Sequence, residues 1–390
     1  MTGTGRAGRS RLGVPAAASP RAQGVTRPGG AMGSAPQRAV TQEQVAREAG
    51  VSRGLVSMAL AGSPRVAQAT RDHILGTAAR LGYRVNRSAA ALASGRSGLI
   101  GLVLPDLRNP FFDFIAHALQ VAAREQGLTL VITLATQVGD GEGAVDTMLA
   151  MQLEGLVLVS PAMPDPVIRA LGRETAVCLI GRTSAGGRVD TVRLDEEAAA
   201  LVVVDHLLGA GTQDLVYLTP PEHEDPNATE RGGALAQACR EAGVRLHTLL
   251  APRDGGGGVG QALARCAQDG RRIGVVAHND VVALDALAAL RAVGGWTPLV
   301  SYDDTYLARR EEFSLTSVEQ PADAMARDAI RLVCERSGRL TLQGRQETGD
   351  GVPAGPEAAS GPGRSLTLEP VLAVRRSSTR PAGDLAPTLR

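Results

Sequence analysis

The sequence contains no lysine, and all 41 of its basic residues are arginine. Aromatic residues are also scarce, with four phenylalanines, four tyrosines and one tryptophan among 390 residues. No apolar run reaches the roughly 18 residues that a membrane-spanning helix needs, so the sequence predicts no partnership with a membrane. We interpret the missing lysine as a compositional bias and assign no function to it.

The sequence is poor in cysteine and in catalytic motifs. Its four cysteines, Cys178, Cys239, Cys266 and Cys334, lack metal-ligand spacing, and we expect buried small side chains in a reducing cytoplasm. Nucleophile elbow, P-loop and zinc-protease motifs are absent, so we expect neither enzyme activity nor a cofactor. His223 stands among acidic residues, but a Pro-rich loop of this kind is more simply solvated than metal-binding.

The charge is divided unevenly along the chain. Residues 1–98 hold 14 arginines against three acidic residues, a net charge of +11, whereas residues 99–390 have a net charge of −10. A basic head on an acidic body is typical of a protein that binds a polyanion with one end. The length allows two or three domains, and residues 1–38, rich in Gly, Ala, Pro and Arg, predict a disordered basic extension.

The stretch 41–62, TQEQVAREAGVSRGLVSMALAG, predicts two short helices joined by a tight turn. Thr41 and Gln44 have the spacing of a capping box, and Ser52 can cap a second helix over 53–61. The second helix leaves Arg53, Gly54, Ser57 and Met58 facing outward. This arrangement is typical of a helix-turn-helix that enters a DNA major groove.

A third helix is expected over 70–81, with Ile74, Leu75, Ala78 and Leu81 on its buried face and Gly82 ending it. From Leu99 onward, short apolar runs such as LIGLVLP, LTLVITL and DLVYLTP alternate with amphipathic segments. Such runs predict parallel strands that are buried on both faces and covered by helices.

Several motifs occur together in a characteristic order: VAREAGVS, TRDHIL, ARLGYRVNR, SGRSGLIGLVLPD, NPFF, VDTVRLD, DHLLGAG, HNDVVALDALAALR, SYDD, LTSVEQP and LTLEPVLAVRRS. Over residues 39–378 the chain resembles the lactose-repressor/galactose-repressor (LacI/GalR) family. The resemblance implies an all-α helix-turn-helix head and a two-lobed α/β effector domain like that of periplasmic binding proteins. It also implies a homodimer that binds a palindromic double-stranded DNA operator.

The resemblance assigns DNA contacts to residues of the head and of a hinge helix. These are Thr41, Ser52, Arg53, Gly54, Ser57, Met58, Asn86, Arg87 and Leu92. Arg53 is expected to read guanine, or alternatively to contact a phosphate. Leu92 is expected to insert into the minor groove, or alternatively to pack in the dimer interface. Met58 stands where the family usually has arginine, which leaves the operator sequence open.

The resemblance also places effector contacts at the carboxyl ends of strands, where ligands of open α/β sheets bind. The expected contacts for a sugar or related small molecule are Asn109, Phe111, Phe112, Arg231, Asn279 and Asp303. Each also has a structural alternative. The phenylalanines suit a core, Asn279 and Asp303 suit caps or turns, and Arg231 suits a surface ion pair.

These inferences give a domain plan. We expect a DNA-binding head over 39–85, a hinge helix and linker over 86–98, an effector and dimerisation domain over 99–378, a disordered insertion over 344–363 and a disordered tail over 379–390. The predicted function is a cytoplasmic repressor whose operator binding is controlled by a sugar effector. The alternatives are a periplasmic-type sugar-binding protein without a regulatory role and a sugar-processing enzyme.

Overall fold

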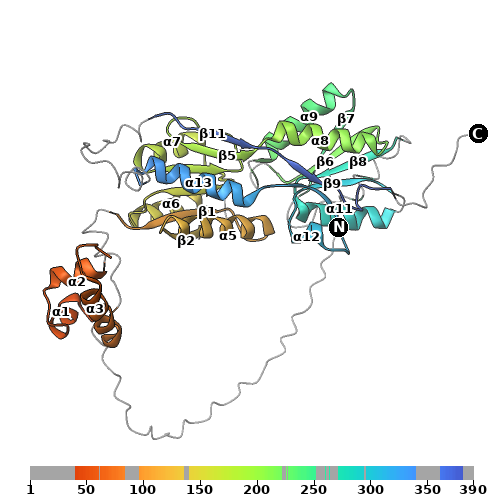
Figure 1. Cartoon of the computed structure of the whole chain (residues 1–390). Helices are drawn as coiled ribbons and strands as arrows, with labels where there is room; N and C mark the ends of the chain where they lie inside the picture. The colour runs from red at the N-terminus through yellow and green to blue at the C-terminus, as the bar shows by residue number, and fades with distance from the viewer. Residues whose placement is uncertain are drawn as a thin grey trace, which may run out of the picture. The chain divides into compact units, whose positions relative to one another are not determined.

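The computed structural model describes residues 40–60, 62–83, 96–135, 140–221, 225, 227–251, 260, 263, 271–293, 296–339 and 361–380. The chain separates into two compact units, with the division after Val85. The first unit is helical, and the second contains two α/β lobes (Figure 1). Among the described helices, none combines the length and apolar character that crossing a bilayer requires.

The first unit contains α1 (Gln42–Glu48), α2 (Arg53–Leu60) and α3 (Gln68–Leu81). The predicted capping box is confirmed, because Thr41 Oγ1 accepts from the Gln44 backbone and the Gln44 side chain accepts from the Thr41 backbone. Val45, Val56 and Ile74 form a small core between the three helices, each with no exposed surface. Gly82 ends α3 with a φ of 69°, as predicted for a left-handed cap.

The prediction for α3 was wrong in two details. The helix begins at Gln68 rather than Thr70, and Leu75 is 41% exposed rather than buried. The buried face consists of Ile74, Thr77 and Ala78. Residues three and four apart share a helix face, whereas Leu75 is turned by about 100° from Ile74 and points away from the core.

The first lobe is built on a parallel sheet with the order β11-β5-β4-β3-β1-β2. Its strands are β1 (Leu99–Leu104), β2 (Thr129–Leu134), β3 (Leu156–Val159), β4 (Val177–Ile180), β5 (Asp190–Leu194) and β11 (Ser365–Leu368). Its helices are α5 (Pro110–Glu125), α6 (Asp140–Ala150), α7 (Asp165–Glu174) and α13 (Ala322–Arg336). Helices α5 and α13 cover one face, and α6 and α7 cover the other.

The second lobe has the strand order β12-β10-β9-β8-β6-β7, in which only the described pair β10–β12 is antiparallel. Its strands are β6 (Asp214–Thr219), β7 (Arg245–Leu250), β8 (Ile273–Ala277), β9 (Leu299–Asp303), β10 (Thr316–Glu319) and β12 (Val371–Ala373). Its helices are α8 (Glu196–Gly209), α9 (Asn227–Glu241), α11 (Asp280–Val293) and α12 (Tyr306–Arg309). The chain passes between the lobes after β5, after β10 and after β11.

Most of the apolar runs form strands that are buried on both faces, as predicted. One exception is β2, which lies at the edge of its sheet and exposes 49% of Ile132 and 38% of Leu134. An edge strand is flanked on one side only, so a continuous apolar run does not guarantee burial. Cys178, Cys239 and Cys334 are buried free thiols, as predicted, whereas Cys266 lies outside the described residues.

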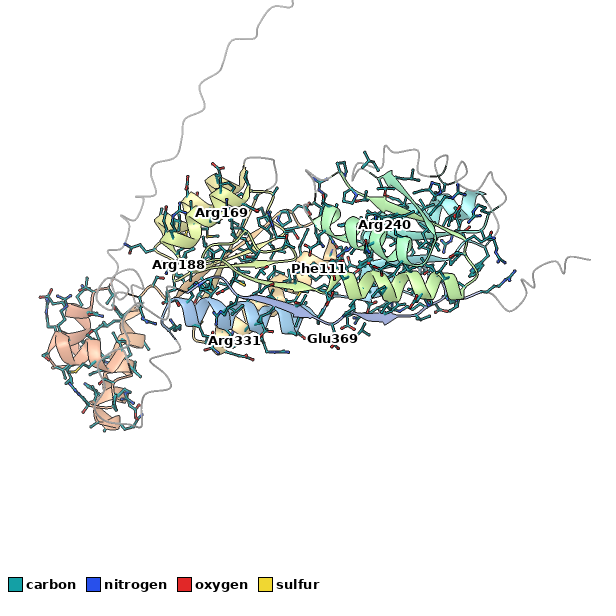
Figure 2. All side chains as sticks on the ribbon, turned by 90° about the horizontal axis from the view of Figure 1, so that it is seen from above. Phe111, Arg169, Arg188, Arg240, Arg331 and Glu369 are labelled. Carbon is teal, nitrogen blue, oxygen red and sulfur yellow. The ribbon has the colours of Figure 1, made fainter. Side chains whose placement is uncertain are left out.

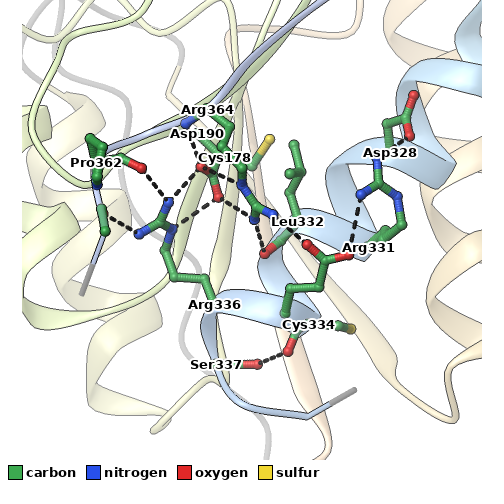
Figure 3. Close-up of polar contacts among 12 residues, drawn as sticks. Cys178, Asp190, Asp328, Arg331, Leu332, Cys334, Arg336, Ser337, Pro362 and Arg364 are labelled. Carbon is green, nitrogen blue, oxygen red and sulfur yellow. Dashed lines mark hydrogen bonds and ion pairs between the residues drawn. The ribbon is translucent and has the colours of Figure 1, made fainter. Parts of the chain in front are cut away.

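A buried ion cluster joins the end of α13 and the segment before β11 to strand β5 of the first lobe (Figure 3). Arg336 at the end of α13 donates to both oxygens of Asp190 on β5, at 2.9 and 2.6 Å, and Arg364 donates to the same carboxylate. Residues 344–360 of the predicted insertion lie outside the described residues. Gly363 is described, and a side chain there would collide with the Val189 carbonyl at 1.9 Å, so this close approach requires glycine.

Candidate functional site

The residues of α2 that were predicted to face outward do so. Arg53, Gly54, Ser57 and Met58 are all exposed, and Ser52 caps the helix by accepting from the Leu55 backbone at 3.2 Å. A β-carbon added at Gly54 would meet only Ser52 Oγ, at 4.0 Å, so packing does not demand glycine at that position. Within the described part of the head, this face is exposed and therefore available to a partner.

Three predicted DNA contacts fall beyond the part of the chain that the structure describes. They are Asn86, Arg87 and Leu92, assigned to the hinge helix, and most of the loop around His223 also lies outside the described residues.

All six predicted effector residues line one cavity between the lobes. Ser160, Gly181, Asp225, Asn227, His278 and Gln320 complete its lining. Phe111 lies between the two lobes when the molecule is seen from above (Figure 2). The cavity volume is about 20 Å³, enough for about one water molecule. A sugar-sized ligand therefore requires the two lobes to move or the side chains to rearrange.

Four of the six lining residues that the sequence analysis did not predict lie directly after a strand. Ser160 follows β3, Gly181 follows β4, His278 follows β8 and Gln320 follows β10. The carboxyl ends of strands in both sheets thus face this cavity. The strand-end signal was present in the sequence for each of these four positions.

A hydrogen bond across the cleft joins the two lobes. Asn109 caps α5 in the first lobe, accepting from the Phe111 backbone at 3.1 Å, and its amide donates to Asp303 of the second lobe at 2.7 Å. Gln320 donates to the other oxygen of Asp303. Burial, together with the charge of Asp280, raises the pKa of Asp303 to about 7. Asp303 also has a φ of 99°, a strained conformation for a residue with a side chain.

Each guanidinium nitrogen of Arg231 already donates a hydrogen bond within the second lobe. Its Nε and one terminal nitrogen donate to Glu196 at 3.0 and 2.8 Å, and the other terminal nitrogen donates to the His278 carbonyl at 2.5 Å. Its guanidinium also stacks on Tyr302, 3.9 Å from the ring centre. The ion pair that we considered as an alternative is therefore present, but it is buried rather than on the surface. Only the remaining N–H groups can donate to a ligand.

His278 lies in a buried chain of polar groups beneath the cleft. Its Nδ1 is 2.7 Å from the Tyr217 hydroxyl, and its Nε2 is 3.1 Å from Asp225. Burial lowers the pKa of His278, although the neighbouring carboxylate of Asp225 opposes this shift. The lowered pKa favours the neutral ring. Asn279, the next residue, accepts from the Val282 backbone at 2.9 Å and so caps α11 while it lines the cleft.

A buried carboxylate ties several segments together behind the cleft. The Ser301 hydroxyl donates to Asp280 at 2.5 Å. Ser317 and Thr305 donate to the same carboxylate, so Asp280 holds the ends of three neighbouring segments together behind the cleft. Ser301 is fully buried and has no described contact with the cavity.

A helical head with an exposed recognition helix and a two-lobed cleft define the fold of LacI-type regulators. Residues 41–86 match the model of bacterial regulatory proteins of the lacI family, and residues 204–352 match a periplasmic binding protein-like domain. The HTH-type transcriptional regulator PtxS of Pseudomonas plecoglossicida is 30% identical over 79% of this chain and 90% of that protein. The chain belongs to the LacI family of transcriptional regulators.

Solved structures agree on the fold. The transcriptional regulator CelR in complex with cellobiose is 25% identical, with a TM-score of 0.58 over 87% of this chain and all of that chain. The lac repressor dimer bound to operator and an anti-inducer has a TM-score of 0.70 over 88% of this chain and all of that chain, at 21% identity. Family membership favours regulation over a periplasmic-type sugar-binding protein without a regulatory role.

Proposed function

We propose that this protein is a sequence-specific, cytoplasmic transcriptional repressor whose operator binding is controlled by a sugar in the interlobe cleft. The observation that carries the proposal is one chain with an exposed recognition helix and a cleft lined from both lobes by hydrogen-bonding side chains. Residues 39–85 serve as the DNA-binding head, 86–98 as hinge and linker, and 99–378 as the effector and dimerisation domain. The protein acts by binding rather than catalysis and needs no cofactor.

DNA recognition is assigned to the start of α2. Arg53 donates to a guanine edge, Ser57 and Met58 contact neighbouring bases, and Thr41, Ser52 and Arg87 contact the backbone. A homodimer presents two heads to a palindromic operator, as the lac repressor dimer bound to operator supports. Asn86 and Leu92 belong to the hinge, where Leu92 enters the minor groove.

Effector binding competes with the contact that joins the lobes. Asn109 and Asp303 bond to each other in the closed cleft, and the same two groups can bond to sugar hydroxyls. Phe111 and Phe112 supply apolar surface, and Asn279 and the remaining N–H groups of Arg231 supply further polar contacts. A sugar that replaces the Asn109–Asp303 bond changes the orientation of the two lobes relative to each other. The paired hinges transmit this change to the heads. A coupling of about 1–3 kcal/mol gives roughly 5- to 150-fold control.

Selection of random duplex DNA by the purified full chain tests the proposal, with the selection repeated across salt concentrations. We expect an enriched palindrome and an affinity that falls steeply with salt. Arg53→Ala is the matched variant, and it should relax the preference at one base pair of each half-site. Sequence-independent binding by the unaltered chain would contradict the proposal.

A further inference from the structure

The charged groups around the effector cleft are unequal in number. Among the described lining residues, Arg231 is the sole arginine, whereas Asp225 and Asp303 are both acidic. His278 also lines the cleft, but it is buried between Tyr217 and Asp225, and burial lowers its pKa, which favours the neutral ring. The described lining therefore offers one cation against two carboxyl groups.

The charge of Arg231 is already matched by a carboxylate. Glu196 accepts from two of its nitrogens, and both side chains are almost completely buried, at 2% and 4% exposure. Asn227 donates to the same carboxylate at 3.1 Å and fixes its orientation. Glu196 is therefore held in place as the partner of Arg231, and an incoming anion would have to compete with it for the guanidinium.

Two further arginines near the cleft each have a carboxylate partner. Arg182, next to the lining residue Gly181, bonds to Asp165 at 2.6 Å and to two backbone carbonyls. Arg193 pairs with Glu230, which neighbours Arg231 in α9 and also accepts from the Thr183 backbone at 3.1 Å. Both arginines are thus committed to contacts within the protein.

We infer that the cleft selects effectors without an anionic group, such as neutral sugars and amino sugars, and rejects sugar phosphates and sugar acids. The inference rests on the proposed function of the cleft. An anion entering it would lose its hydration, meet no uncompensated cation and approach two carboxyl groups. A hydroxyl or ammonium group would instead donate to Asp303 or Asp225.

The electrostatic potential of the cleft can be measured without knowing the effector. Ser160 lines the cavity and is partly exposed, so Ser160→Cys places a reactive thiol there. The full chain should also carry Cys266→Ser, because Cys266 lies outside the described residues, whereas Cys178, Cys239 and Cys334 are buried. The rates at which a cationic and an anionic methanethiosulfonate reagent modify this thiol are compared at about pH 8, above the pKa of Asp303. Each rate is divided by the rate of the same reagent with the free thiol 2-mercaptoethanol.

We expect the cationic reagent to react at least about tenfold faster at Ser160→Cys, equivalent to about 1.4 kcal/mol. Gln237→Cys is the matched control on the exposed face of α9, where Arg240 and Glu241 flank it, and its ratio should be near one. Glu196→Gln, which leaves Arg231 uncompensated, should shift the Ser160→Cys ratio towards the anionic reagent. Equal rates at Ser160→Cys, or a faster anionic reagent, would overturn the inference.

A second experiment separates the inference from the proposed function. Release of the selected operator is followed while glucose, glucosamine, gluconate and glucose 6-phosphate are added, together with the corresponding forms of other sugars. Release by neutral or amino members alone supports both conclusions. Release by a sugar acid or a sugar phosphate overturns the inference that the cleft rejects anions and leaves the regulatory function intact. A cation-selective cleft whose sugars never affect operator binding would instead contradict the proposed function.

Discussion

The recognition helix and the effector cleft use their residues in opposite ways. On α2, Arg53, Ser57 and Met58 are exposed, and the small core of the head is formed by other residues. In the cleft, nearly every lining side chain also has a structural partner: Asn109 caps a helix, and Arg231 pairs with Glu196. Substitutions on the first surface should therefore change binding alone, whereas substitutions in the second should change stability and binding together.

The largest effect is expected at Arg231. Arg231→Ala leaves Glu196 buried without its cation and should lower the free energy of unfolding by about 3–5 kcal/mol. The double variant Arg231→Met with Glu196→Leu removes both charges and should recover most of that loss. Urea unfolding measures both values, and equal destabilisation of the single and double variants would contradict the role of the ion pair.

A pH-dependent effect is expected at Asp303. Its pKa of about 7 lies above the value of about 3.9 for an unfolded aspartate, so the folded state binds more protons between these values. The stability contributed by Asp303 is therefore complete below about pH 4 and is lost as the pH rises through about 7. Asp303→Asn should remove this part of the pH dependence in urea unfolding. If the free energy of unfolding depends on pH in the same way for Asp303→Asn and for the unaltered chain, the raised pKa of Asp303 is contradicted.

Arg53→Ala should weaken operator binding by about 1–3 kcal/mol while changing stability by less than about 0.5 kcal/mol. Arg80→Ala, which removes an exposed arginine from α3, is the matched control. A lost phosphate contact reduces affinity for every sequence equally, whereas loss of Arg53 should relax the preference at one base pair. Fluorescence anisotropy on single-base operator variants distinguishes these cases, and a uniform loss for Arg53→Ala would assign it to the backbone.

The smallest effect is expected at Thr41, where the head does depend on an exposed side chain. Thr41→Ala removes the capping box of α1 and should destabilise the head by about 1 kcal/mol. Thr41→Ser keeps the hydroxyl and should retain most of that stability. Thermal unfolding followed by far-ultraviolet circular dichroism compares the two, and equal losses would argue against the cap.

Local signals in the sequence predicted the head well. Capping residues, turn glycines and helical spacing act within a few positions, so Thr41, Ser52 and Gly82 could be assigned from their neighbours. Leu75 was misplaced because two adjacent apolar residues in a short helix leave its buried face ambiguous. The burial of β2 was overestimated because strand order in a sheet is not encoded in the strand itself.

The cleft could be predicted only in part. Strand ends revealed the positions of Asn109, Asn279 and Asp303, because parallel strands bring their carboxyl ends to one edge. Their pairing could not be predicted, since Asn109 and Asp303 are 194 positions apart in the chain. The same holds for Glu196 and Arg231, whose bond makes the arginine a structural cation as well as a cleft residue.

The central claim is that ligand in the cleft and operator at the head are energetically coupled. The most direct test measures sugar affinity by calorimetry with and without bound operator, and operator affinity with and without saturating sugar. Linkage requires the two affinities to change by the same factor, which we expect to lie between about 5 and 150. A sugar that binds the cleft with the same affinity whether or not operator is present would contradict the claim.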